Sequence, residues 1–323
     1  MPSPSAGPKI EPKFSVALFV VTVLITLAGL FGGLAFLAPG VWQSQLAASW
    51  GSLAAVFLAV HLFAALVEFV FHRYVLHAPL VPFLSYFYKQ HTLHHALTRI
   101  DYQKSRDGRE NIPRLVEGVA INRYPIMDEP QYEASYFPWY TLAVFALLGS
   151  FLFAPIQWLL PEAPVFLGGY LAIAWSLVLY ELIHAMEHWP QAIWDRLIQQ
   201  KRWGRFWRKA YAFHLRHHAD IRCNEAISGF FALPLIDLAF GTYVDPETLY
   251  THGRPVSPQE FVSPRPRLAL VRWLDRQAES AVKRRRQRRA GGAPGPVAGA
   301  PANERIPTVG PKFAAALARR TES

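Results

Sequence analysis

The residues best suited to chemistry in this sequence are histidines at regular spacing. Ten of the chain's twelve histidines stand in four short boxes, His72 and His77; His91, His94 and His95; His184 and His188; and His214, His217 and His218. In three boxes the histidines are three or four residues apart, which places side chains on one face of a helix. In the first box they are five apart, which fits a helix end or a break better than a straight helix.

Neutral imidazole is a common ligand for zinc, iron and copper, and one helix face can present two or three ring nitrogens to an ion. Ten nitrogens are too many for a single tetrahedral or octahedral ion. The pattern therefore predicts a binuclear, histidine-rich metal site with all ten as ligands. A scatter of unrelated surface or core histidines does not explain the repeated spacing.

The composition is that of a membrane protein. The chain has 323 residues, of which 52% are hydrophobic, and its formal net charge is +10. In such a protein this charge indicates a cytosolic face near anionic lipid rather than nucleic-acid binding. The single cysteine, Cys223, excludes a disulfide framework and a thiolate zinc cluster.

Four apolar runs are long enough to cross a bilayer, which needs about 20 residues of helix. They cover residues 14–38, 48–70, 137–160 and 165–186. The first run is too long for the core of a signal peptide. We therefore expect an all-α integral membrane protein with four transmembrane helices and a cytosolic, histidine-rich helical cap.

The segments between the runs complete this picture. Residues 39–47 are expected to form a short turn, and residues 78–90 to lie in the membrane interface. Residues 96–136 have no clear period and are expected to form a soluble lid or loop. Residues 189–209 alternate aromatic and basic side chains, which is typical of a helix in the headgroup layer.

The charge distribution predicts the orientation. With four spans, both termini and all four boxes share one side, while the other side has two short turns with no Lys or Arg. Positively charged loops stay cytoplasmic, so both termini and the boxes should face the cytosol. We expect three regions: a disordered leader (1–13), a membrane-embedded domain (14–262) and a basic, low-complexity tail (263–323).

Two polar residues interrupt the second span. His61, Glu68 and His72 lie on one stripe of a helix, within about 40° of one another. Polar groups in a membrane usually face the bundle interior. We expect Glu68 to orient the His72 imidazole and His61 to line a substrate cavity, the alternative being hydrogen bonding between helices.

The boxes HX4H, HX2HH, HX3H and HX2HH in four hydrophobic spans resemble the fatty acid hydroxylase/sterol desaturase superfamily, over about residues 50–245. An acidic residue, Glu181, stands three residues before the third box, as in that superfamily. The stretch from Asp237 to Phe240-Gly241-Thr242 is also similar to one found in relatives. The sequence departs from the pattern at Trp189, where many members have a histidine, and at Glu225, where relatives commonly have an aromatic residue.

The resemblance implies two iron ions that use O2 to oxidise an unactivated lipid C–H bond. It implies that the ten box histidines hold the metal and that Glu68, Glu181 and Glu187 support them. Partners would be a membrane lipid and a separate electron donor, a ferredoxin or a cytochrome with its reductase. We favour hydroxylation of a lipid acyl chain. A sterol, carotenoid or lipid-head-group hydroxylase or desaturase is the alternative within the superfamily.

Other classes of protein remain open. His184-Ala-Met-Glu187-His188 matches the H-x-x-E-H signature, in which Glu187 would be the general base of a membrane zinc hydrolase. That reading leaves the other eight box histidines without a role. A haem-binding electron carrier would need histidines paired within the spans, where only His61 lies deep. A catalytically inactive, metal-binding structural protein is a further alternative.

Overall fold

The computed structural model describes residues 16–104, 118–126, 131, 135, 137–247 and 255–291. The chain divides into two units, Met1–Val282 and Lys283–Ser323. In the second unit only the helical residues 283–291 are described. The expected leader at 1–13 and the end of the expected tail, 292–323, lie outside the described residues.

Among the described residues, four helices are long and apolar enough to span a membrane, as predicted. They are α1 (Val16–Leu37), α3 (Trp50–Phe71, continued by a π-helical turn to Leu76), α6 (Thr141–Leu159) and α7 (Val165–Glu187). Large apolar side chains such as Leu18, Phe36 and Trp158 are exposed on them. A bilayer would cover these surfaces, so the fold fits an integral membrane protein.

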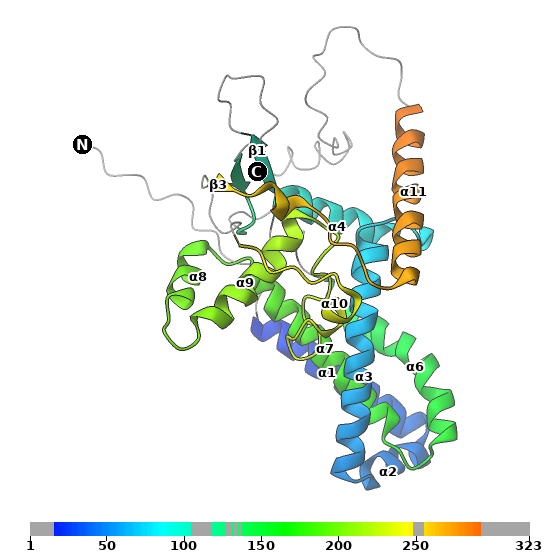
Figure 1. Cartoon of the computed structure of the whole chain (residues 1–323). Helices are drawn as coiled ribbons and strands as arrows, with labels where there is room; N and C mark the ends of the chain where they lie inside the picture. Colours follow the sequence, from blue (N-terminus) through cyan, green and yellow to red (C-terminus); the bar gives the residue numbers. More distant parts are fainter. Residues whose placement is uncertain are drawn as a thin grey trace, which may run out of the picture. The chain divides into compact units, whose positions relative to one another are not determined.

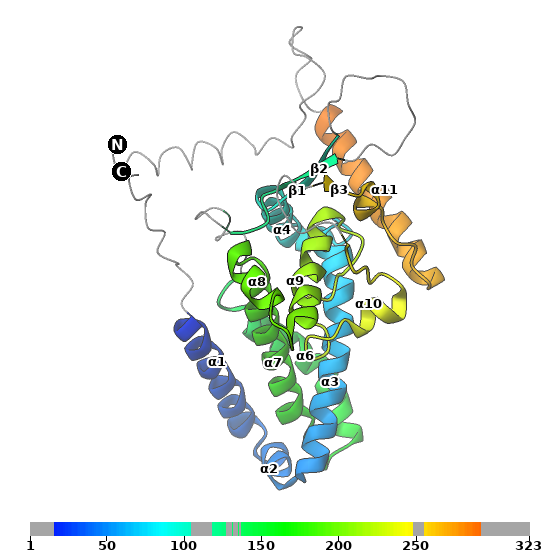
Figure 2. The ribbon, with the colours of Figure 1, turned by 60° about the vertical axis from the view of Figure 1, so that its left-hand side comes forward.

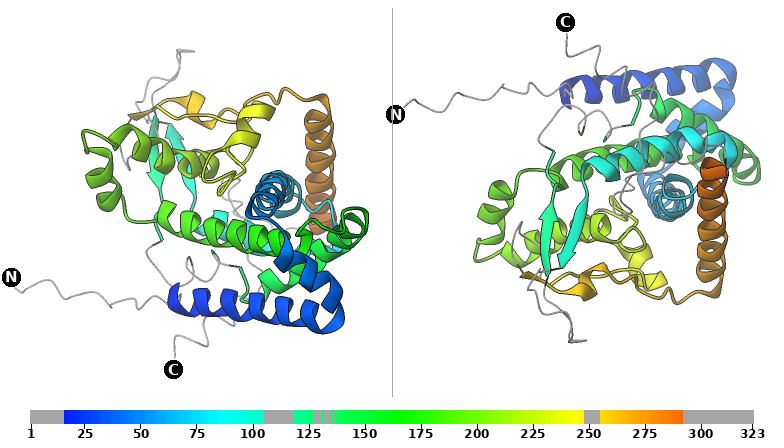
Figure 3. Two further views of the ribbon diagram at one scale, coloured as in Figure 1. Left: turned by 90° about the horizontal axis from the view of Figure 1, so that it is seen from below. Right: turned by 90° about the horizontal axis from the view of Figure 1, so that it is seen from above.

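Helix α7 lies at the centre of the bundle, where it contacts the other three spans, and α3 lies beside it (Figures 1 and 2). Two glycines of α7 allow neighbouring helices to approach closely. A Cβ atom at Gly168 would lie 2.8 Å from Val56 of α3, and one at Gly169 would lie 2.5 Å from Phe153 of α6. Small residues commonly occupy such contacts between membrane helices. Helix α1 packs against α6 and α7 and is largely exposed (Figure 3).

The end of the bundle away from the histidine boxes is closed by amide hydrogen bonds. The expected turn at 39–47 is instead a short helix, α2 (Pro39–Ala47). Its Gln45 binds Gln157 of α6 at 3.0 Å and accepts the backbone N–H groups of Phe166 and Leu167. These belong to the first turn of α7, where helix N–H groups lack partners within the helix. The sequence prediction missed α2 because Pro39-Gly40 resembles a turn signal.

Above the spans, helices bring the other boxes to the ends of α3 and α7. Helix α4 (Ser85–Leu97) carries the second box, and α9 (Gly204–Ala219) carries the fourth. Residues 85–90, expected to lie in the interface, are the first turns of α4 after a 3-10 turn (Pro82–Leu84). Helix α10 (Leu235–Phe240) follows the fourth box and contacts α3.

The aromatic and basic segment 189–209 forms no single interfacial helix. It contains α8 (Gln191–Ile198) and the start of α9, which pack against each other. Trp194 is buried and stacks on Tyr211 of α9, with ring centroids 5.0 Å apart. Of the aromatic side chains in this segment, Trp189, Trp203 and Phe206 are 40–52% exposed and remain available to a headgroup layer. The alternation of aromatic and basic residues therefore arises in part from the packing of α8 against α9, and not solely from a position in the membrane interface.

A small sheet adds to the predominantly helical fold in part of the expected 96–136 loop. Strand β1 (Ile100–Lys104) pairs antiparallel with β2 (Gly118–Asn122), which pairs with β3 (Pro255–Val256). The register joins Ile100 to Asn122 and Gly118 to Val256. This pairing was not predicted because residues 96–136 show no clear period and β3 lies far along the chain from β1 and β2.

Part of the expected tail is a helix anchored to the bundle. After a 3-10 turn (Pro258–Phe261) comes α11 (Ala269–Gly291). Its Asp275 binds Arg73 at 2.8 and 2.9 Å and accepts a hydrogen bond from the Tyr74 hydroxyl. The boundary expected at 263 therefore does not separate residues 269–282 from the bundle.

Candidate metal centre

All ten box histidines converge at one end of the bundle. Two main sets of ring nitrogens form, each with all atoms within 4.8 Å of one another. The first histidine group is His72, His77, His91, His95 and His217, and the second is His94, His184, His188 and His214. His218 makes a further set with His94 and His95, and its Nε2 lies 3.0 Å from that of His214. It therefore lies between the two groups.

The first box depends on a change of helix geometry. His72 to Leu76 form a π-helical turn, in which the N–H of His77 donates to the carbonyl of His72. In an α-helix, residues five apart point about 140° away from each other. Here the rings of His72 and His77 lie 4.9 Å apart. The expectation of a helix break at this box is confirmed, and such turns are frequent at functional sites.

The two HX2HH boxes are divided between the groups. On α4, His91 and His95 belong to the first group and His94 to the second. On α9, His217 belongs to the first and His214 to the second. Each of these helices thus passes between the two groups and contributes to both.

Main-chain carbonyls hold four of the rings in one orientation. In each, the ring Nδ1–H donates to a backbone carbonyl oxygen: His72 to Glu225 (2.5 Å), His188 to Tyr124 (2.7 Å), His217 to Cys223 (2.8 Å) and His218 to Thr98 (3.0 Å). A carbonyl oxygen can only accept, so the hydrogen is on Nδ1. The lone pair of each neutral ring is then on Nε2, the atom that faces the other histidines.

His94 is oriented in the same sense through a hydroxyl. Its Nδ1 lies 2.9 Å from Ser135 Oγ, and Ser135 donates its own hydrogen to the Gln131 carbonyl at 2.6 Å. The hydroxyl oxygen therefore accepts from His94. Histidines that ligate metal ions usually donate a hydrogen bond from their second ring nitrogen in this way.

The inward Nε2 atoms are close to one another. Pairs across the first group are 2.9 to 3.1 Å apart, and pairs in and beside the second are 3.0 to 3.3 Å apart. For example, His91 Nε2 lies within 3.1 Å of the Nε2 atoms of His72, His77 and His95, and it could donate a hydrogen to only one of them. The remaining lone pairs face each other, which is unfavourable unless a cation lies between them.

These spacings fit a shared ion. With a metal–nitrogen bond of about 2.1 Å, two ligands at a right angle are about 3.0 Å apart, and tetrahedral ligands about 3.4 Å. The donor set is nitrogen throughout, which suits iron, zinc or copper. The residues present thus fit a metal centre, without selecting the metal.

Burial keeps the imidazoles in the form that binds metal. It lowers the pKa of His94, His214 and His218 well below 6.5, and neighbouring histidines lower it further. The pKa of His188 falls to about 4, again through burial. Neutral rings at pH 7 keep their lone pairs available.

An ion-pair network lies behind the first group. Arg73 Nη1 binds Glu225 Oε1 at 2.8 Å, and Glu225 Oε2 lies 3.8 Å from His72 Nδ1 and 3.9 Å from His217 Nδ1. Burial raises the pKa of the Glu225 carboxyl, and the Arg73 guanidinium opposes that rise. Arg73 and Asp275 were not predicted as part of the site, although a charged residue beside His72 at the end of an apolar span was a usable signal.

The prediction that Glu68 orients His72 is wrong. Its carboxylate accepts from the backbone N–H and hydroxyl of Ser228 at 2.8 and 2.5 Å, and from Gly229 N–H at 3.2 Å. The helical stripe placed Glu68 on the correct side of α3, but the chain after the fourth box returns and binds it. The carboxylate near His72 is that of Glu225.

The other two predicted carboxylates lie near the second group without binding a histidine. Glu181 is buried, and its Oε1 accepts the Phe137 backbone N–H at 3.0 Å. Glu187 is also buried, and its Oε2 has no hydrogen-bond partner among the described residues. Neither carboxylate belongs to the two histidine groups. The orienting role expected for them is instead filled by carbonyls and by Ser135.

His61, expected to line a substrate cavity, makes a hydrogen-bonded contact between elements. Its Nδ1 binds Ser176 Oγ of α7 at 2.8 Å, and its Nε2 accepts the Phe231 N–H at 3.1 Å. It is fully buried and touches the ring of Phe230. The alternative reading, hydrogen bonding between helices, describes it better.

The Asp237 stretch holds the loop that supports the first group. Asp237 accepts the backbone N–H groups of Glu225 and Ala226 at 3.0 and 2.9 Å, and the Thr242 hydroxyl at 2.7 Å. Gly241 has φ +72°, and a Cβ there would meet the Arg267 side chain. This motif therefore positions the Glu225 carbonyl that orients His72.

The sequence matches no family model, and no curated protein or solved structure is significantly similar to it.

Proposed function

We propose that this protein is an integral-membrane di-iron oxygenase that hydroxylates an unactivated C–H bond of a membrane lipid, with an acyl chain favoured. The observation that carries the proposal is the convergence of ten histidines from four boxes into two adjacent groups. The box order and spacing, which resemble the fatty acid hydroxylase/sterol desaturase superfamily, support it.

The overall reaction defines what the protein needs. A C–H bond is converted to C–OH by one O2 with two electrons and two protons, and the second oxygen leaves as water. An iron pair would supply the one-electron chemistry that hydrocarbon requires and that side chains lack. The two electrons need an external donor, a ferredoxin or a cytochrome with its reductase.

The residues of the chain would bind the metal and exclude water. The ten histidines would be the ligands, with carbonyls and Ser135 fixing the rings. Most of these rings are buried, which separates a reactive site from solvent. The site lies where α3 and α7 end, at the level where a lipid in the bilayer could reach it. Following the charge distribution, we propose that this end faces the cytosol.

A membrane zinc hydrolase is the alternative from a different class. His184, Glu187 and His188 would form its core, and Glu187 has an unpartnered oxygen as a base would. However, His184 and His188 share their group with His94 and His214, which leaves no clear open position on a tetrahedral zinc. The first group would also have no role.

Metal analysis and lipid mass spectrometry test the proposal. The purified protein should contain two iron ions per chain, whereas the hydrolase predicts one zinc. Membranes of cells expressing the protein should contain a lipid that is 16 Da heavier than its precursor and that forms only when O2 is present. A lipid lighter by 2 Da would instead indicate desaturation. The matched control is His61→Asn, which alters a buried histidine outside both groups and should keep both signals. One zinc and no oxidised lipid would overturn the proposal.

A further inference from the structure

The chain after the fourth histidine box turns back along the membrane spans. Residues 229–238, called here the returning segment, include the first turn of α10. Helix α10 contacts α3, and in Figures 1 and 2 this part of the chain lies alongside α3 rather than beyond its histidine-bearing end. The returning segment is therefore close to surfaces that a bilayer would cover.

Ring contacts show how deep the returning segment reaches. The Phe231 ring lies 4.6 Å from the ring of His61 on α3 and 6.1 Å from that of Trp175 on α7. His61 is 11 residues before His72, which corresponds to about 16 Å of helix. Trp175 is 9 residues before His184, or about 14 Å. Phe231 is therefore level with the middle of two helices that are long enough to cross a bilayer.

The exposed side chains of the returning segment are large and apolar. Phe231, Leu233, Leu235 and Leu238 are 37–51% exposed. Between residues 226 and 240, all of which the structure describes, the one charged side chain is Asp237, and it is buried. Large apolar side chains grouped on one surface indicate a contact with a membrane or another protein.

The backbone of this region has the hydrogen bonding that a segment inside a bilayer requires, because hydrocarbon offers no partner for an N–H group. Glu68 accepts the N–H groups of Ser228 and Gly229, and His61 accepts that of Phe231. The remaining N–H groups from 228 to 235 bind nearby main-chain carbonyls, namely those of Phe230, Ala232, Leu233 and Leu235, while Pro234 has none. A loop in water could leave such groups to the solvent.

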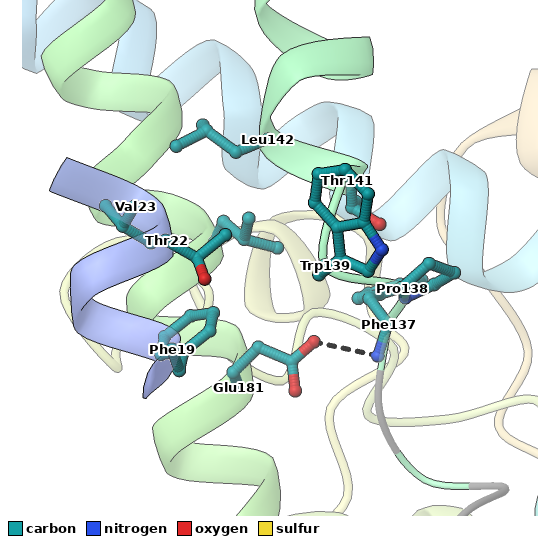
Figure 4. Close-up of a pocket in the computed structure, with 10 residues that line it drawn as sticks. Phe19, Thr22, Val23, Phe137, Pro138, Trp139, Thr141, Leu142 and Glu181 are labelled. Carbon is teal, nitrogen blue, oxygen red and sulfur yellow. Dashed lines mark hydrogen bonds between the residues drawn. The ribbon is translucent and has the colours of Figure 1, made fainter. Parts of the chain in front are cut away.

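A second glutamate in a span acts in the same way. Glu181 of α7 accepts the backbone N–H of Phe137, where the chain leads into α6, as the dashed line in Figure 4 shows. Glu68 and Glu181 thus both bind irregular backbone beside a membrane helix. Such backbone is tolerated at membrane depth where protein groups satisfy it.

We propose that the returning segment is a re-entrant element of the membrane domain. It enters the bilayer from the histidine-bearing end of the bundle, is held there by Glu68, and contacts lipid acyl chains with its exposed apolar side chains. The partner is lipid hydrocarbon because the segment is level with the spans and its described residues carry no exposed charge. Asp237 of α10 also binds the backbone of Glu225, so the element connects the bilayer to the loop that orients His72. The inference does not require the proposed oxidation.

Fluorescence quenching in vesicles tests the depth of the returning segment. Leu233→Cys and Leu238→Cys would be labelled with bimane in the full-length chain, whose own Cys223 is buried, and reconstituted in phosphatidylcholine vesicles. Lipid brominated in the middle of its acyl chains quenches a label in hydrocarbon, and iodide on both sides of the membrane quenches a label in water. We expect both labels to be quenched by the brominated lipid and at least about threefold less by iodide than a label in water, because hydrocarbon excludes ions.

Two positions calibrate the measurement. Leu147→Cys, on the exposed face of α6, is the matched control for lipid contact, and Glu279→Cys, about half exposed on α11, is the control for water. Labels on the returning segment should behave like the one at Leu147. Iodide quenching equal to that at Glu279 would place the segment in water. Quenching by neither agent would indicate a covering protein, such as a second copy of the chain. Either result would overturn the proposal.

Variants at Glu68 test how the segment is held. Glu68→Leu leaves three donors without an acceptor, namely the N–H and hydroxyl of Ser228 and the N–H of Gly229. We expect the Leu233 label to lose most of its protection from iodide, whereas Glu68→Gln keeps an acceptor and should stay within about twofold of the unaltered chain. Val67→Leu, at the neighbouring exposed position, is the matched control and should change nothing. Full protection in Glu68→Leu would refute the anchoring role.

Discussion

The two histidine groups differ in what lies behind them. The first has charges: Glu225 near His72 and His217, then Arg73, then Asp275 of α11. With one guanidinium and two carboxylates, these named charges sum to −1. The second has neutral partners, the Ser135 hydroxyl and the Tyr124 carbonyl, and the Tyr124 ring lies 4.3 Å from His188.

The groups also differ in exposure. All four histidines of the second group are buried, whereas His77 and His95 of the first are partly exposed. A carboxylate beyond the imidazoles raises their basicity as ligands. We therefore expect the first group to bind its cation more tightly and the second to be better shielded from water. Two sites built from one residue type can thus be given different properties by their surroundings.

Removing a histidine between the groups should have the largest effect. His94 belongs to the second group and to the set with His95 and His218. We expect His94→Ala to lower iron below two per chain and to reduce lipid oxidation at least about 100-fold, more than loss of an outer partner. Metal analysis and product mass spectrometry check this. Full iron content and activity would refute the ligand assignment.

Removing Asp275 should affect the first group through the charge network. In Asp275→Ala, the buried Arg73 loses two hydrogen bonds, and Tyr74 loses one. We expect the free energy of unfolding to fall by about 2–3 kcal/mol, together with weaker binding of one ion. Denaturant unfolding and iron titration measure both.

The same helix offers a control for that experiment. Glu279 pairs with Arg222, but both side chains are about half exposed. Glu279→Ala should therefore change stability by no more than about 0.5 kcal/mol. Equal effects of the two substitutions would show that the network does not support the first group.

Neutralising Glu225 should separate charge from hydrogen bonding. Glu225→Gln keeps the backbone carbonyl that binds His72 and a side-chain acceptor for Arg73. We expect about tenfold weaker binding of one ion, with the other unchanged, because only the charge behind the first group is lost. Anaerobic titration of metal-free protein with iron(II) should resolve the two steps. Simultaneous weakening of both would indicate that the groups act as one site.

The smallest effect is expected behind the second group. Ser135→Ala removes the hydroxyl that accepts from His94 Nδ1. One neutral hydrogen bond of about 1 kcal/mol corresponds to about fivefold weaker binding of one ion. The iron(II) titration used for Glu225→Gln should show a shift in the other binding step. A shift in the binding step that Glu225→Gln also affects would contradict the assignment of the histidines to two separate groups.

Local patterns in the sequence predicted the spans and the histidines well. The thickness of the bilayer sets the length of an apolar run that crosses it. The ends of α1, α6 and α7 therefore lie within a few residues of the expected ones. The boxes depend on helical periodicity, and all ten rings meet.

Features that depend on distant partners were not predictable in the same way. The division of His91, His94 and His95 between groups depends on α4 bringing His91 to His72 and His94 to His184, residues far from α4 along the chain or on another helix. Glu68 was placed on the correct face, but its partner Ser228 lies 160 residues further along. The charge of Asp275 gave no sign of a partner at Arg73, about 200 residues away.

The π-helical turn at His72–Leu76 explains why the first box has four residues between its two histidines. Four residues between two histidines suit a widened turn, whereas the three residues between His184 and His188 suit ordinary α-helix. Deleting one residue between His72 and His77 would restore α geometry there and shift the register of everything that follows. The spacing of a motif can thus encode local helical pitch, and two similar motifs need not be interchangeable between helices.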